Sequence, residues 1–175
     1  MILRESLSVD QFLSLIKQEI GQPKLKLLYR GSRDGFGTDD FHNKCDNHFK
    51  TITIIETTKG FIFGGYTQAT WSSSSGKYTN DPNAFLFSLV NRFNKPFLSK
   101  VINVNTAIYS FSSCGPTFGS GHDICICDNS NTSEQSSSNF PHSYSQPKDI
   151  NDPNGNYLCD SRNFQVKEIE VFQLQ

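Results

Sequence analysis

The clearest secondary-structure signal in the chain is a pair of strand-like segments joined by a short turn. Residues 51–58 read TITIIETT, residues 59 and 60 are Lys-Gly, and residues 61–67 read FIFGGYT. β-Branched and aromatic side chains favour strands, and two such runs separated by a turn predict a β-hairpin. Gly64 and Gly65 weaken the second strand and indicate a bulge or a close approach of another part of the backbone.

Further strand-like runs follow at intervals typical of a sandwich, and with the hairpin they make roughly eight strands. They cover residues 24–29, 84–91, 97–102, 107–112, 123–128 and 164–174. Apolar residues at helical spacing predict a helix over residues 9–20, with Ser8 and Gln11 as a capping box. Thr38 is expected to cap a second, short helix over residues 39–45. The predicted fold class is mainly β (α+β), with two antiparallel sheets packed as a β-sandwich and flanked by a few short helices.

The segments between these elements are polar or rich in glycine. We expect a glycine-rich turn over residues 30–37, a polar loop around Trp71 over residues 70–82, and a glycine loop over residues 113–121. Residues 129–156 are rich in Ser, Asn and Pro and predict a mobile surface excursion. Along the last strand both faces mix apolar and charged side chains, which predicts a bulge or burial of both faces.

Charge and composition limit the classes of function. The chain of 175 residues suits one domain, and its 15 Phe residues predict an aromatic core inside a polar shell. The 16 basic residues against 17 acidic residues leave no basic excess, so nucleic acid is not an expected partner. No run approaches the roughly 18 apolar residues of a membrane span, and polar residues interrupt the start where a signal peptide would be apolar. We therefore expect a cytoplasmic protein, with a nuclear one as the alternative, and in either case reduced thiols.

Five cysteines at irregular spacing predict free, structural thiols. Cys125 and Cys127 lie two apart on one face of a predicted strand, and the alternative is that they act as a redox pair. Asp123 and Asp128 flank this pair, and negative neighbours raise the pKa of a thiol, which makes it less reactive.

Several motifs contain residues that could carry chemistry. His42, Cys45 and His48 would fan around a helix with no fourth ligand nearby, so no metal site is predicted. The segment from Arg30 to Gly35 lacks the order of a phosphate-binding loop, and a pair between Arg30 or Arg33 and Asp34 would simply hold the turn.

A second set of motifs leaves an enzyme open as the alternative reading. Ser120, His122 and Asp123 are too close in sequence for the usual catalytic triad geometry. Glu168 and Glu170 lie two apart on one strand, where paired carboxylates could act as acid and base. An enzyme would require His122, Asp123 and Glu170 to converge in one pocket.

Six blocks in a fixed order resemble the TLDc domain family, and particularly the short TLD-domain proteins of unicellular eukaryotes. They are LLYRGSRDGF at 27–36, DFHNKCDN at 40–47, GFIFGGYTQATW at 60–71, DPNAFLFSL at 81–89, GPTFGSGHDICICDN at 115–129 and FQVKEIEVFQL at 164–174. On this resemblance the domain covers residues 24–175, and residues 1–23 form a helix that belongs to it or leads into it. Phe172 stands where animal relatives commonly carry a Trp.

The resemblance implies a β-sandwich flanked by helices, a role in protection against oxidative stress, and direct binding to the vacuolar proton-pumping ATPase. It implies no established reaction and no cofactor. We expect a monomer that binds a protein partner and is recruited to endomembranes through it. Loops on a rigid scaffold commonly present binding residues, so the expected partner-binding residues lie in or near the loops. They are Arg30, Arg33, Asp34, Trp71, His122, Asp123 and Glu170.

Overall fold

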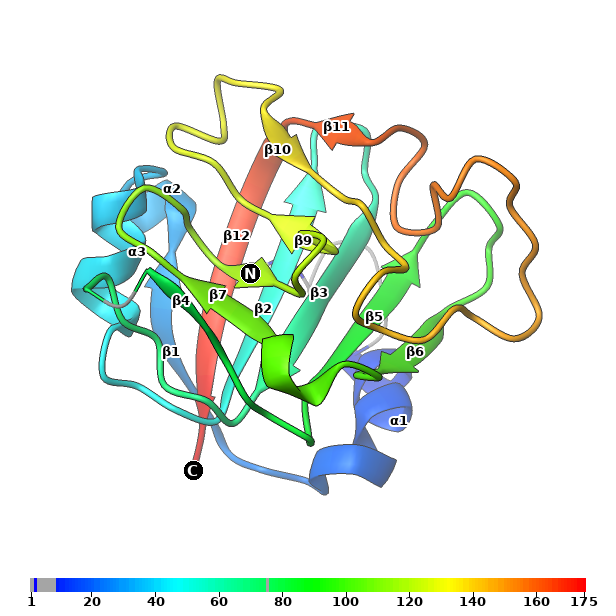
Figure 1. The fold of residues 1–175 in the computed structure, drawn as a ribbon, viewed down its shortest axis with the longest axis horizontal. Helices are drawn as coiled ribbons and strands as arrows, with labels where there is room; N and C mark the ends of the chain where they lie inside the picture. Colours follow the sequence, from blue (N-terminus) through cyan, green and yellow to red (C-terminus); the bar gives the residue numbers. More distant parts are fainter. Residues whose placement is uncertain (1, 3–8, 75) are drawn as a thin grey trace.

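Two six-stranded antiparallel sheets pack face to face in the computed structural model, which describes residues 2, 9–74 and 76–175 (Figure 1). The first sheet has the strand order β1-β12-β2-β3-β5-β6, and the second sheet has the order β11-β10-β9-β8-β7-β4. The predicted β-sandwich with a few short helices is therefore confirmed.

The strands of the first sheet are β1 (Leu25–Arg30), β2 (Thr51–Thr57), β3 (Ile62–Thr67), β5 (Phe85–Val90), β6 (Phe97–Lys100) and β12 (Val166–Leu174). Those of the second sheet are β4 (Lys77–Thr79), β7 (Ile108–Ser110), β8 (Thr117–Phe118), β9 (Ile124–Cys125), β10 (Ser136–Ser137) and β11 (Asn163–Phe164). The helices are α1 (Val9–Ile20), α2 (Gly31–Asp34), α3 (Thr38–Cys45) and the 3-10 helix η2 (Val104–Thr106).

The hairpin of β2 and β3 lies in the middle of the first sheet, with Thr51 opposite Thr67 and Glu56 opposite Ile62. Its outer face carries Ile52, Ile54 and Ile62, which share one apolar cluster with Ile16 of α1. Its inner face carries Ile55 and Phe63, which belong to the cluster between the sheets. Because helix and second sheet cover opposite faces, the hairpin is apolar on both.

The mixed pattern of the last strand comes from a bulge in β12. Val166 pairs with Thr57 of β2, but the next pair joins Glu168 to Glu56, so Lys167 is an extra residue. One extra residue reverses the face that the following side chains occupy. Val166 and Ile169 therefore both lie in the cluster between the sheets although they are three residues apart.

The second sheet differs most from what the sequence predicts. β4 lies in the expected polar loop of residues 70–82, β8 in the expected glycine loop, and β10 in the expected surface excursion. The one-turn helix α2 occupies the expected turn of residues 30–37. These elements have four residues or fewer, too few to show a hydrophobic period in the sequence.

The interpretation of residues 129–156 as a mobile surface excursion is wrong. Phe140, Tyr144 and Ile150 from this segment are buried in the cluster between the sheets. Phe140 stacks on Phe97 of β6 with ring centroids 6.0 Å apart, and the Tyr144 hydroxyl donates a 2.6 Å hydrogen bond to the Ala107 carbonyl. These buried side chains hold part of an otherwise polar segment against the core.

Helix caps differ in part from the prediction. Gly37, not Thr38, is the N-cap of α3, and the Asp40 carboxylate accepts a 2.9 Å hydrogen bond from the Gly37 N–H. Phe41 and Cys45 point inward as expected. Ser8 lies outside the described residues, so the predicted cap of α1 is not described.

Candidate functional site

Trp71 is a core residue and not part of a surface loop. Its side chain has no exposed area, and its ring packs edge-on against Phe41 of α3 and Phe118 of β8. The indole N–H donates a 2.8 Å hydrogen bond to the Thr51 hydroxyl, which satisfies its one polar group. A partner cannot touch Trp71 while it is buried in this way, so its expected role as a contact residue is replaced by a role in packing.

Arg30 and Glu170 form an ion pair on neighbouring strands. Arg30 at the end of β1 pairs with Glu170 of β12, and its Nε lies 2.8 Å from Glu170 Oε1. Glu170 has no exposed area, and its other oxygen accepts a hydrogen bond from the Ile2 N–H at 3.1 Å. Because a buried carboxylate is stable only when paired, Glu170 holds the edge of the first sheet together and offers no surface to a partner.

Helix α2 continues this polar cluster to the surface. Arg33 is exposed and contacts Asp34 through two hydrogen bonds of 2.7 and 2.9 Å, while Lys44 lies 3.9 Å from the same carboxylate. The Arg33 hydrogen bond outweighs partial burial and lowers the pKa of Asp34. Ser32 binds Glu168 through its N–H and its hydroxyl. The interpretation of Arg33 and Asp34 as a pair that holds this turn is confirmed.

Asp123 organises the loops of the second sheet. Its carboxylate is fully buried and accepts backbone hydrogen bonds from His142 at 2.6 Å and from Ser143 at 2.9 Å. Burial raises its pKa, and these N–H groups partly offset that effect. A Cβ at Gly119 would lie 1.8 Å from Asp123 Oδ2, so the glycine makes room for the carboxylate. Asp123 thus acts as a structural clamp between residues 119–123 and 142–143.

His122 joins a group of aromatic side chains. It has a positive φ of 56°, and its ring stacks on Tyr109 with centroids 5.9 Å apart. Tyr109 also contacts Tyr78 and Phe111, which are both 41% exposed. We call His122, Tyr109, Tyr78 and Phe111 the aromatic patch; it lies on β4 and β7 and the loops beside them. The sequence did not indicate it because β4 was not recognised.

The residues of the enzyme hypothesis do not form one site. Glu170 binds Arg30 and Ile2 on the outer face of the first sheet, Asp123 binds a loop beside the second sheet, and His122 stacks on Tyr109. The Ser120 hydroxyl lies 3.4 Å from His142 Nδ1 and 3.0 Å from the Ser143 hydroxyl, and not beside His122. The candidate catalytic residues that the sequence offered therefore do not converge in the structure.

His42 is a structural histidine between α3 and the turn after β7. Its Nδ1 lies 2.7 Å from Asp46, and its Nε2 lies 3.0 Å from the carbonyl oxygens of Phe111 and Cys114. Burial opposes ionisation of Asp46, but hydrogen bonds from His42 and Ser73 outweigh it and lower its pKa. Among the described residues, no group of three or more His, Cys, Asp or Glu side chains could hold a metal ion.

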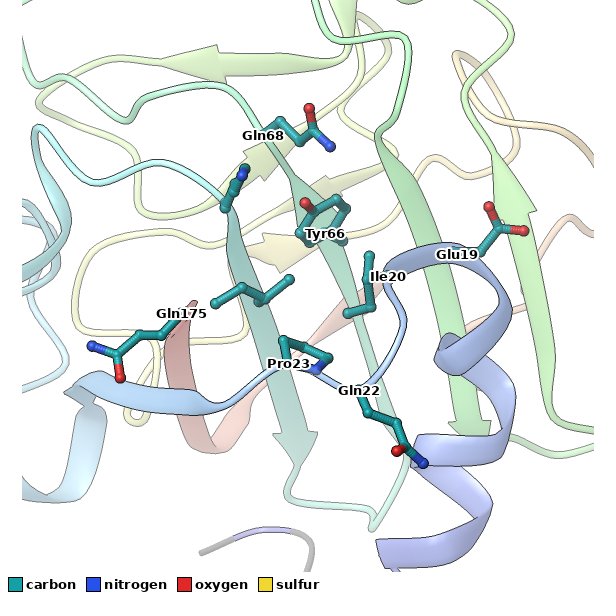
Figure 2. A pocket seen from close by; sticks show the side chains of 9 residues that line it. Glu19, Ile20, Gln22, Pro23, Tyr66, Gln68 and Gln175 are labelled. Atoms are coloured by element: carbon teal, nitrogen blue, oxygen red, sulfur yellow. The ribbon is translucent and has the colours of Figure 1, made fainter.

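An open groove of about 480 Å³ lies between the end of α1 and the outer face of the first sheet. Figure 2 shows Tyr66 of β3 and Ile20 of α1 in its middle, with Gln22, Gln68 and Gln175 around them. These residues come from separate segments, and each is unremarkable in its own sequence context. Sequence reasoning therefore missed the groove, and no local motif could have indicated it.

Comparison with known proteins identifies the family to which this sequence belongs. Residues 2–175 match the TLDc domain, which covers both sheets and α1. The chain belongs to the TLDc domain family. Within the described residues of this TLDc domain, no helix has the length and apolar character needed to cross a membrane.

The MTOR-associated protein MEAK7 of Danio rerio is similar to this TLDc domain. The two are 27% identical over 84 residues, which is 48% of this chain and 18% of the zebrafish protein. The likeness covers only a small part of that relative, so the activity of the whole relative does not transfer to this chain.

Proposed function

We propose that this TLDc domain is a non-catalytic interaction module that binds and regulates the vacuolar proton-pumping ATPase and in this way contributes to protection against oxidative stress. The match of the TLDc domain to residues 2–175 carries the proposal, because the partner and the stress role come from the family resemblance. In this proposal the domain acts as a cytoplasmic monomer without a cofactor and reaches endomembranes through the pump.

The contact surface that we propose is centred on α2 and the aromatic patch. Arg33 on α2 is 47% exposed at its side chain, and Tyr78 and Phe111 are the exposed aromatic residues of the patch. Arginine and aromatic side chains are the residue types that most often dominate binding energy at protein interfaces. His42 of α3 ties the turn that carries Phe111 to the helices, so both parts lie on one side of the molecule (Figure 1).

A matched pair of alanine variants tests the surface. Arg33→Ala and Lys59→Ala each remove an exposed cation that is paired with an aspartate, Asp34 or Asp160. We expect purified pump sectors to bind the wild type and Lys59→Ala equally, and to bind Arg33→Ala at least about tenfold more weakly, as for a typical interface arginine. Surface plasmon resonance measures the affinities, and thermal unfolding checks that both variants fold.

Affinity purification from cells tests the partner itself. Recovery of pump subunits with the wild-type domain supports the proposal, and their absence while a pump-binding TLDc relative recovers them overturns it. The likeness to a protein named as mTOR-associated favours a second candidate, a complex that contains mTOR. Recovery of mTOR components without pump subunits would replace the first partner by the second.

A further inference from the structure

Three of the five free cysteines meet beside the second sheet, although one of them is distant from the other two in the sequence. Cys114 lies in the turn after β7, and backbone hydrogen bonds join the next residues, Gly115 and Pro116, to Ile126. These backbone hydrogen bonds place Cys114 opposite the segment that carries Cys125 and Cys127. The Thr117 hydroxyl donates a hydrogen bond to Cys125 Sγ at 3.7 Å, and Cys114 and Cys127 both lie close enough to Cys125 to influence its pKa.

The surroundings of Cys114 differ from those of Cys127, which has the same partial exposure. The Cys114 sulfur has the Ser113 hydroxyl 3.9 Å away, a group that can donate a hydrogen bond to a thiolate. The Cys127 thiol instead donates to the Gln135 carbonyl at 3.1 Å, an interaction that a thiolate would lose. Local geometry therefore favours the thiolate at Cys114 and the neutral thiol at Cys127.

The pKa shifts of the cysteines also distinguish Cys114 from Cys127. The hydrogen bond from Cys125 lowers the pKa of Cys114 to about 6 despite partial burial, with support from Ser113 and from nearby His42. The hydrogen bond to Cys114 and burial raise the pKa of Cys125, and burial raises the pKa of Cys127. Burial also raises the pKa of Cys45, and that of Cys159 to about 11.

We propose that Cys114 is a peroxide-reactive thiol and that Cys125 is its resolving partner. A thiolate is the nucleophile in such chemistry and needs access to solvent, and Cys114 combines both properties. The sequence had drawn attention to Cys125 and Cys127, which are neighbours in the chain. The tertiary structure instead brings Cys125, which pairs with Thr117 in the β8–β9 hairpin, close to Cys114, eleven positions before it in the sequence.

The reaction balances with hydrogen peroxide as the oxidant. The Cys114 thiolate attacks one oxygen, the O–O bond breaks, and the leaving hydroxide takes a proton to become water, which leaves a sulfenic acid on Cys114. The Cys125 sulfur then attacks the Cys114 sulfur; its proton and the sulfenic hydroxyl leave together as a second water. The two thiols lose two electrons, the peroxide gains two, and a disulfide remains.

Peptide mapping after brief treatment of the full chain with hydrogen peroxide tests the pair. We expect Cys114 to be oxidised at least tenfold faster than Cys127 and Cys159, and a peptide in which Cys114 is linked to Cys125. In Cys125→Ser, dimedone should trap a sulfenic acid at Cys114 in at least fivefold higher yield than in the wild type. In Cys114→Ser, oxidation of Cys125 should fall to the rate of Cys159, whereas Cys159→Ser should change nothing at the cluster.

Equal rates at Cys114 and Cys159 would overturn the assignment of the reactive thiol, and a Cys114–Cys127 disulfide as the main product would overturn that of the resolving thiol. The alkylation rate of Cys114 against pH gives a separate readout, with an expected midpoint near pH 6 in the folded chain. Cys125→Ala should move this midpoint upward, and Cys125→Ser should restore much of the shift because a hydroxyl can still donate. A midpoint identical in folded and urea-unfolded chains would overturn the proposal. None of these measurements involves the pump.

Discussion

The strands of the first sheet have four to nine residues, whereas every strand of the second sheet has two or three. In the first sheet, long ladders of backbone pairs such as β12 with β2 carry the arrangement. In the second sheet the ladders are too short to fix the arrangement of the strands, and hydrogen bonds to side chains contribute instead. Asp123 accepts backbone N–H groups of residues 142 and 143, the Ser136 hydroxyl of β10 accepts the Cys127 N–H, and the Ser138 hydroxyl donates to the Asp123 carbonyl. A sheet of very short strands is therefore defined by buried polar side chains as much as by strand pairing.

The largest expected effect is that of Asp123→Ala. It leaves the N–H groups of His142 and Ser143 without their acceptor in a buried region, and we expect a loss of about 3 kcal/mol in the free energy of unfolding. Urea denaturation measures it, with Asp149→Ala on the surface as the control at under about 0.5 kcal/mol. If the two variants unfold alike, the second sheet does not depend on this side chain and the contrast between the sheets fails.

Gly65→Ala tests the contact between the two sheets. The new Cβ would lie 2.7 Å from the Phe118 ring of β8 and 2.8 Å from Leu86 of β5, so both must move. We expect about 2 kcal/mol of destabilisation in thermal unfolding, typical of an overpacked core. Gly60→Ala has open space but a φ of +83°, and should cost only about 1 kcal/mol. A larger loss at Gly60 would mean that backbone strain, and not packing between the sheets, limits the hairpin.

Asp46→Asn should have the smallest effect on stability, and only at acidic pH. The pKa of Asp46 is lowered in the folded chain, so its carboxylate contributes stability above the ordinary value of 3.8 that is lost as pH falls below it. The variant lacks this titration and should show a flatter decline in stability below about pH 4, by less than about 1 kcal/mol. Denaturant titrations between pH 2.5 and 7 give both curves, and parallel curves would contradict the assignment.

How well the sequence predicts a helix or strand depends on the length of that element. The hairpin of β2 and β3, the long last strand and α1 show clear periods, and each was predicted within two residues of its ends. β4, β8 and β10 are too short to show a hydrophobic period in the sequence. Among the site residues, the Arg33–Asp34 pair was predictable because its members are adjacent. Burial of Trp71, Asp123 and Glu170 was not, since their partners lie 19 to 168 residues away in the sequence.

By itself the sequence determined that this protein is a largely β domain with a Phe-rich core, free thiols and the blocks of the TLDc family, because these depend on local pattern and residue type. Only the tertiary structure decided which polar residues face solvent, that residues 129–156 pack into the core, and that Cys114 meets Cys125. The reason is physical: burial and hydrogen-bond partners are set by segments that come together from distant positions, and short elements carry too few residues to encode that meeting locally. Neighbours in the chain such as His122 and Asp123 can therefore have unrelated roles, whereas residues that are distant in the sequence can have a common role.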